Sequence, residues 1–177
     1  MDGKRFIGGR AALVLAVLAL GVLSGCARTS VSHLDSRPVV AAAPASLPMQ
    51  FFRFDFTGKP VANGYVVRGR AVPVPDALPP WVDRLEELTL AAYLRDPAGT
   101  VLSTCEKSYK GMPLGDGAAI PFEFVLSPAG DAAGNYAISF GYKAVFGSQK
   151  ARRAVGASGP PPAGTVFFAS EGALVRQ

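Results

Sequence analysis

The sequence is poor in the residues that most often carry catalysis and metal binding. Its 177 residues include one histidine, two cysteines and one tryptophan. A serine hydrolase of the nucleophile-elbow kind needs a Gly-x-Ser-x-Gly turn and a histidine base, and the chain has no such turn. A catalytic cysteine needs a base near the thiol, and the common zinc and copper sites need imidazole or several thiolates. The sequence therefore predicts no catalytic residue of these kinds, no metal site and no cofactor.

Carboxylates are the remaining option for catalysis, because the Ser-x-x-Lys motif is absent too. Asp83, Glu86 and Glu87 form the only dense acidic group. Glycoside hydrolysis requires two carboxylates that face each other across a cleft, whereas neighbouring residues of a strand point to opposite sides. We therefore expect these three side chains to be solvated charges.

Long hydrophobic runs are also scarce, and the longest lies at the N-terminus. Three basic residues, Lys4, Arg5 and Arg10, precede an apolar run over 11–23. A bilayer-spanning helix needs about 20 apolar residues, so this run is too short, but it suits the apolar region of an export signal. The run ends in Leu23-Ser24-Gly25-Cys26, where small residues precede a cysteine.

This tetrapeptide resembles the lipobox of bacterial lipoproteins, over residues 1–26. The resemblance implies that residues 1–25 are a cleaved signal peptide and that the Cys26 thiol receives a diacylglyceryl group. It also implies acylation of the new amino terminus, and two or three acyl chains hold a protein stably on a membrane. Because Ala27 is not the aspartate linked to inner-membrane retention, the resemblance implies the periplasmic face of the outer membrane in a Gram-negative cell. The alternatives are an ordinary secretory signal cut elsewhere and an uncleaved helical anchor.

Charge and cysteine content give little sign of a partner and exclude an internal disulfide if Cys26 is lipidated. The chain has 18 basic and 13 acidic residues; three of the former and one of the latter lie in residues 1–25, which leaves 15 and 12. This small excess gives no reason to expect nucleic-acid binding. With Cys26 lipidated, Cys105 has no partner for an internal disulfide. Cys105 is then either a small apolar core residue or a thiol that pairs with another protein.

Beyond the signal, we expect a flexible linker over 26–50 and one domain over 51–177. The linker is rich in Ala, Pro and Ser without a strand or helix period, and it includes His33. In the domain, alternation of apolar and polar residues predicts strands that start at Phe51, Tyr65, Glu87, Thr100, Ile120, Tyr136 and Thr165. Residues 81–95 also fit a helical stripe, although strict alternation over 88–94 favours a strand. A basic loop is expected between Gly147 and Gly164.

Six or seven strands separated by turns predict an all-β protein, an antiparallel β-sandwich. Within it, Leu94-Arg95-Asp96-Pro97-Ala98-Gly99 joins two predicted strands through a turn. Residues 87–126 resemble the Ig-like FxLYD type of extracytoplasmic domain on this pattern. The resemblance implies an Ig-like sandwich and assigns no functional residue.

Two features are candidates for binding. Lys143, Lys150, Arg152 and Arg153 are a basic group able to contact phosphates of lipid headgroups, or simply a solvated loop. Trp81, beside Pro79 and Pro80, is an exposed anchor for a partner or a sugar, or a plug at one end of the sandwich.

These observations favour a non-catalytic envelope lipoprotein whose domain binds another protein, as an accessory part of an assembly. The first alternative is a binding module for envelope glycans or lipid headgroups. The second is a hydrolase that uses carboxylates alone.

Lipidation of Cys26 can be tested directly. We expect the protein purified from membranes to begin at residue 26 and to carry the mass of a diacylglyceryl group and an acylated amino terminus. Substitution C26S should abolish the modification and release the protein from the membrane fraction, because the acyl chains supply the anchor. Mass spectrometry of the native protein decides: an unmodified sulfhydryl at position 26 would contradict the interpretation.

Overall fold

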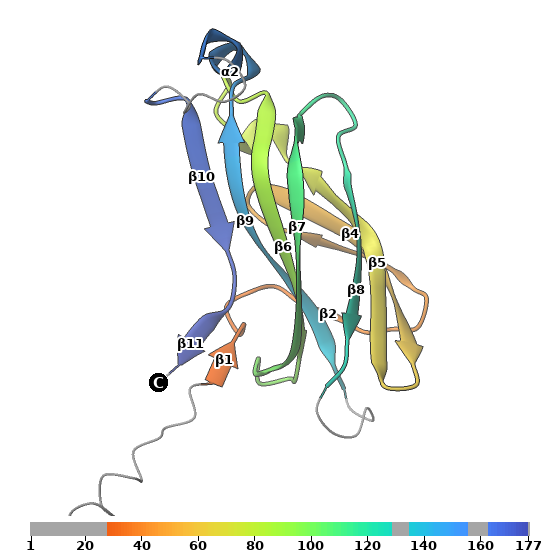
Figure 1. The fold of residues 1–177 in the computed structure, drawn as a ribbon. Coiled ribbons are helices and arrows are strands. Elements are labelled where there is room, and N and C mark those ends of the chain that lie inside the picture. The colour runs from red at the N-terminus through yellow and green to blue at the C-terminus, as the bar shows by residue number, and fades with distance from the viewer. Residues whose placement is uncertain (1–27, 129–134, 156–162, 177) are drawn as a thin grey trace, which may run out of the picture.

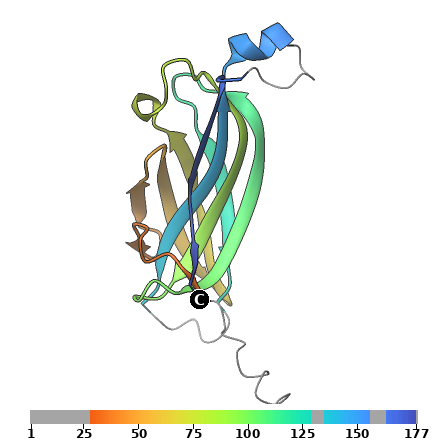
Figure 2. The ribbon, with the colours of Figure 1, turned by 90° about the vertical axis from the view of Figure 1, so that its left-hand side faces the viewer.

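The chain folds as two antiparallel β-sheets packed face to face, which confirms the predicted all-β sandwich (Figures 1 and 2). The structure is a computed structural model that describes residues 28–128, 135–155 and 163–176. The predicted signal peptide and Cys26 lie outside the described residues.

The larger sheet has five strands in the order β10-β9-β6-β7, with β2 paired to the start of β9. Its strands are β2 (Arg37–Pro38), β6 (Arg84–Arg95), β7 (Val101–Pro113), β9 (Ala137–Gly147) and β10 (Val166–Glu171). The second sheet has four strands in the order β3-β4-β5-β8: β3 (Pro44–Pro48), β4 (Phe52–Val61), β5 (Gly64–Pro73) and β8 (Ile120–Leu126).

The two ends of the described chain pair with each other outside the sandwich. Strand β1 (Arg28–Ser30) lies antiparallel to β11 (Leu174–Arg176) as a separate two-stranded sheet. The remaining elements are the 3-10 turn η1 (Pro75–Ala77) and one short helix, α2 (Gln149–Val155). No helix in the described part of the chain is both long and apolar enough to span a membrane.

All seven strands expected from alternation are present, and the ambiguous segment forms a strand. β6 covers Arg84–Arg95 and pairs along its length with β7 and β9, so it is the centre of the larger sheet. Its inner face carries Leu88, Leu90, Ala92 and Leu94, all buried. Burial of a continuous apolar face on β6 outweighs the helical stripe that the same residues can form.

Aromatic rings from both sheets fill the space between them. Phe140 on β9 stacks on Phe54 of β4 with centroids 4.4 Å apart and an interplanar angle of 1°. Phe122 on β8 lies 5.3 Å from the Phe140 ring, and Phe52 meets Tyr142 at 5.0 Å. The alternating phenylalanines of β4 therefore interlock with the alternating aromatic residues of β9, which is the main contact between the sheets.

The prediction of a flexible linker over 26–50 is wrong for residues 28–50, which the structure describes. Residues 28–50 contribute β1, β2 and β3, and β3 pairs with β4 over five residues. Val31 and Leu47 are fully buried, and Leu34 is nearly so. Sequence periodicity misses these strands because they are short. Pro44 and Pro48 are the first and last residues of β3, an edge strand, where proline is tolerated.

A buried arginine fixes the segment that follows β1. Arg95 is only 9% exposed. Its Nη1 donates hydrogen bonds to the carbonyl oxygens of Val31 and Leu34 at 3.1 and 3.3 Å. Val31 and Leu34 also form a small second core with Ala91 and Tyr93 on the outer face of the larger sheet. These contacts clamp residues 31–34 onto the sheet.

The turn between β6 and β7 accommodates this clamp through Gly99. Its φ is +85°, and a Cβ there would lie 2.6 Å from Cβ of Ser32. The Gly99 carbonyl accepts the amide of Val31 at 2.9 Å. Only glycine combines this backbone conformation with so close an approach of the N-terminal segment.

The prediction of a basic loop after Gly147 is also wrong for residues 149–155, which form a helix. Residues 149–155 form α2, and the Asp83 carboxylate caps its start by accepting the amide of Gln149 at 2.6 Å. The capping residue lies 66 positions earlier in the chain, so the sequence around residue 149 does not indicate that a helix starts there. Residues 156–162 lie outside the described part.

The aromatic contact between the sheets makes a clear stability prediction. F140A should lower the free energy of unfolding by about 3–5 kcal/mol, because it empties the centre of the core. F168A, which truncates a residue 73% exposed on the outer face, should change it by no more than about 0.5 kcal/mol. Equilibrium denaturation of both variants measures this, and equal losses would contradict the burial assigned to these two rings.

Candidate functional site

The outer face of the larger sheet is hollowed into a groove. Two adjoining hollows, of about 550 and 740 Å³, share Thr89, Lys143 and Ser170 in their linings, and we call the pair the outer groove. Thr89 belongs to the outer face because its neighbours Leu88 and Leu90 point into the main core. The groove therefore lies on the side of the sheet that faces away from the sandwich.

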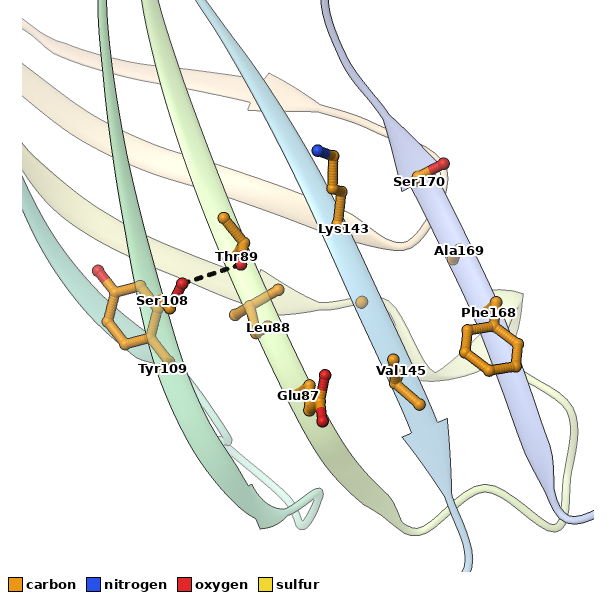
Figure 3. A pocket seen from close by; sticks show the side chains of 11 residues that line it. Glu87, Leu88, Thr89, Ser108, Tyr109, Lys143, Val145, Phe168, Ala169 and Ser170 are labelled. Carbon is orange, nitrogen blue, oxygen red and sulfur yellow. Dashed lines mark hydrogen bonds between the residues drawn. The ribbon is translucent and has the colours of Figure 1, made fainter. Parts of the chain in front are cut away.

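Strand register assembles a row of polar side chains across the floor of the groove. Ser108 of β7 pairs with Thr89 of β6, Thr89 with Lys143 of β9, and Lys143 with Ser170 of β10. The two hydroxyls of Thr89 and Ser108 are 3.0 Å apart, within hydrogen-bonding distance (Figure 3). Lys143 makes no ion pair with any described residue, so its exposed ammonium is available for an outside carboxylate or phosphate.

The next row is apolar at its β10 end. Lys110 pairs with Glu87, Glu87 with Val145, and Val145 with Phe168. Phe168 and Val145 lie side by side on neighbouring strands, and the Phe168 ring is 73% exposed (Figure 3). An exposed phenylalanine beside a half-buried valine is an apolar contact surface at the rim of the groove.

The opposite end of the groove is closed by the terminal segments. Here the Glu171 carboxylate accepts the Tyr142 hydroxyl at 2.5 Å and the backbone amide of Gln50 at 3.0 Å. Burial, and then the neighbouring carboxylate, raise the pKa of Tyr142 far above its usual value, so the phenol stays protonated and donates. These bonds hold the end of β10 in place.

Strand β10 is an edge strand without the usual protection against pairing. The other long edges carry residues that discourage strand addition: Glu106, Lys107 and Lys110 on β7, Pro44 and Pro48 on β3, Pro121 and Glu123 on β8. β10 reads Val-Phe-Phe-Ala-Ser-Glu, and its only charge is the Glu171 already engaged at its end. In Figure 2, β10 lies on the side of the domain that faces the viewer, and none of the described elements is drawn in front of it.

The structure separates the residues predicted as a basic group. Lys143 lies in the groove, in the middle of a strand, whereas Lys150 and Arg153 lie on α2, beyond the end of the sandwich (Figure 1). The Arg152 side chain is outside the described part. The predicted group is therefore not one site, and only Lys143 belongs to the groove.

Trp81 lies near the α2 end of the sandwich and is 39% exposed. A hollow of about 520 Å³ nearby is lined by its neighbours Pro79, Pro80 and Val82, and Trp81 is not part of that lining. The structure thus leaves Trp81 as a partly exposed end residue and does not combine it with the basic residues.

The other candidate residues do not form a catalytic or metal site in the described part of the chain. The expectation of three solvated carboxylates is wrong for Glu86, whose side chain is 11% exposed and pairs with Arg84 at 3.3 Å. Asp83 caps α2, and Glu87 is exposed in the groove, as expected. Cys105 is half-buried and packs against the main core from β7. Among the described residues, no three His, Cys, Asp or Glu side chains are grouped to hold a metal ion.

Sequence reasoning missed most of the outer groove. Thr89, Ser108 and Ser170 are unremarkable in the sequence and meet only through the register of four strands. One local signal was available: Phe167-Phe168 places bulky apolar side chains on both faces of a predicted strand. Because only one face of such a strand packs on the core, one of the two phenylalanines must lie on the solvent face.

Comparison with known proteins gives no relative for this chain. No protein-family model, no curated protein sequence and no solved structure matches it.

Proposed function

We propose that this protein is a membrane-anchored, non-catalytic envelope lipoprotein whose domain binds a protein partner. The observation that carries the proposal is the unprotected edge of β10 beside the outer groove. The lipobox-like sequence ending at Cys26 supports the anchor, and the absence of the common catalytic motifs from the sequence supports a binding role.

The partner offers an extended segment that adds to the sheet next to β10. A bare edge presents backbone amides and carbonyls that an added strand satisfies, and the side-chain alternation of that strand supplies specificity. Every second side chain of the segment falls on the outer face, in line with the rows that end at Phe168 and Ser170.

These rows define the chemistry of the segment. The side chain in line with Phe168 contacts an exposed aromatic ring, so an apolar residue is favoured there. Two positions away, the side chain in line with Ser170 faces Lys143 across a short hydroxyl residue, so an acidic residue is favoured. The partner segment therefore pairs an apolar residue with an acidic one, two positions apart.

Site-specific crosslinking in intact cells tests this proposal. A photoreactive amino acid at position 168 should yield a discrete adduct with another protein, through a segment that carries the apolar and acidic pair. The same amino acid at position 61, where Val61 is 41% exposed at the far end of β4, is the matched control and should yield none.

Three substitutions, one of them a control, sharpen the result. F168K should weaken binding about tenfold or more, because it removes an aromatic contact and places a charge on the edge strand, whereas V61K should have no effect. K143E should reduce the adduct at position 168 without changing the thermal unfolding midpoint. Adducts formed only with glycan, lipid or a second copy of this chain would contradict the proposal, as would equal crosslinking from positions 168 and 61.

A further inference from the structure

The N-terminal strand begins unusually close to the proposed acylation site. β1 starts at Arg28, two residues after Cys26. Even a fully extended chain spans only about 3.3–3.6 Å per residue, so the Cα atoms of these two residues are at most about 7 Å apart. A lipid on Cys26 therefore leaves β1 very little distance from the bilayer surface.

β1 cannot move away from the domain to lengthen this connection without breaking buried contacts. Ser30 is 7% exposed and Val31 is fully buried. The amide of Val31 donates to the Gly99 carbonyl at 2.9 Å, and its own carbonyl accepts from the Arg95 guanidinium. All three residues of β1 also pair with β11.

The surface beside this connection suits a membrane. Leu174 and Val175 of β11 are 56% and 68% exposed, and as neighbours they lie on opposite faces of the two-stranded sheet, so both of its faces carry an apolar side chain at this end. Arg28 is an exposed cation on the adjoining strand, next to the point where the chain leaves for Cys26. Apolar side chains with a neighbouring cation are the pattern of a surface that touches phospholipid headgroups.

We propose that the β1–β11 end of the domain lies directly against the phospholipid bilayer, with Leu174 and Val175 at the headgroups. This proposal rests on the lipid anchor of the proposed function. It replaces a domain on a flexible tether by a domain held upright on the membrane.

The upright orientation places the other features of the molecule. β6 runs from the α2 end of the sandwich to the β1–β11 end (Figure 1). Its first residue, Arg84, pairs with Gly147 just before α2, and its last, Arg95, bonds to Val31 next to β1. At about 3.3 Å per residue, its 12 residues span roughly 40 Å. Trp81 then lies far from the bilayer, while the β10 edge runs up the side of the domain and stays open to a partner.

Tryptophan fluorescence tests the orientation, because Trp81 is the only tryptophan. The lipidated protein is purified from membranes and reconstituted into phosphatidylcholine vesicles with or without brominated acyl chains. Trp81 should be almost unquenched by the brominated lipid. The variant W81F/V175W, which moves the reporter to β11, should be quenched several-fold more strongly.

A linker variant tests whether the short connection to Cys26 causes the quenching, and a flotation assay tests for the lipid anchor. Ten Gly and Ser residues inserted between Ala27 and Arg28 of the W81F/V175W chain should lower the quenching toward that of Trp81, because two apolar side chains alone hold the domain weakly. Flotation with the vesicles shows whether the lipid anchor is present, and thermal unfolding shows that each variant is folded.

Two results would overturn the orientation while leaving the anchor in place. The first is equal quenching of floated protein from positions 81 and 175, and the second is quenching at 175 that the inserted linker does not reduce. Protein that does not float with vesicles refutes both the anchor and the orientation. Crosslinking from position 168 bears on the partner alone, so failure of the partner proposal is recognised separately.

Discussion

The guanidinium of Arg95 is the group on which the arrangement of the chain ends depends. It is buried, and its hydrogen bonds go to the backbone carbonyls of Val31, Leu34 and Asp96. A hydrogen bond from a charged donor contributes more to stability than one from a neutral donor. Without the guanidinium, these buried carbonyl oxygens would lose hydrogen bonds that offset the cost of taking them out of water. Because the clamp holds residues 31–34, β1 is fixed beside β11, and the chain ends meet at one end of the sandwich.

The same clamp divides the outer face of the larger sheet into a covered and an open part. Over Ala91 and Tyr93 the N-terminal segment forms the second core. Two residues earlier on β6, Thr89 lies in the open groove beside Lys143. The groove thus exists because the covering segment ends partway along the sheet, and β10 borders the open part. A single sheet face serves both the docking of the chain ends and, in our proposal, the recognition of a partner.

Much of the fold was predictable because its signals are local. Alternating phenylalanines in β4 and alternating aromatic residues in β9 predicted two strands of the core, and β8 begins at the predicted residue, Ile120. The linker and the basic loop were wrong because β1, β3 and α2 are stabilised by distant residues, Arg95 and Asp83 among them. The groove was not predictable for the same reason: Lys143 gains its polar neighbours only from register between strands far apart in sequence.

Hydrogen exchange of the native protein most directly tests the claim that the chain is part of the fold from β1 onward. The account predicts that the amides of Val31 and Leu34, bonded to the carbonyls of Gly99 and Val31, exchange slowly, as amides of β6 do. Exchange of these two amides at the rate of an unfolded peptide, with β6 protected, would contradict it. That result would return residues 28–34 to a flexible linker and remove the physical basis for a domain held against the membrane.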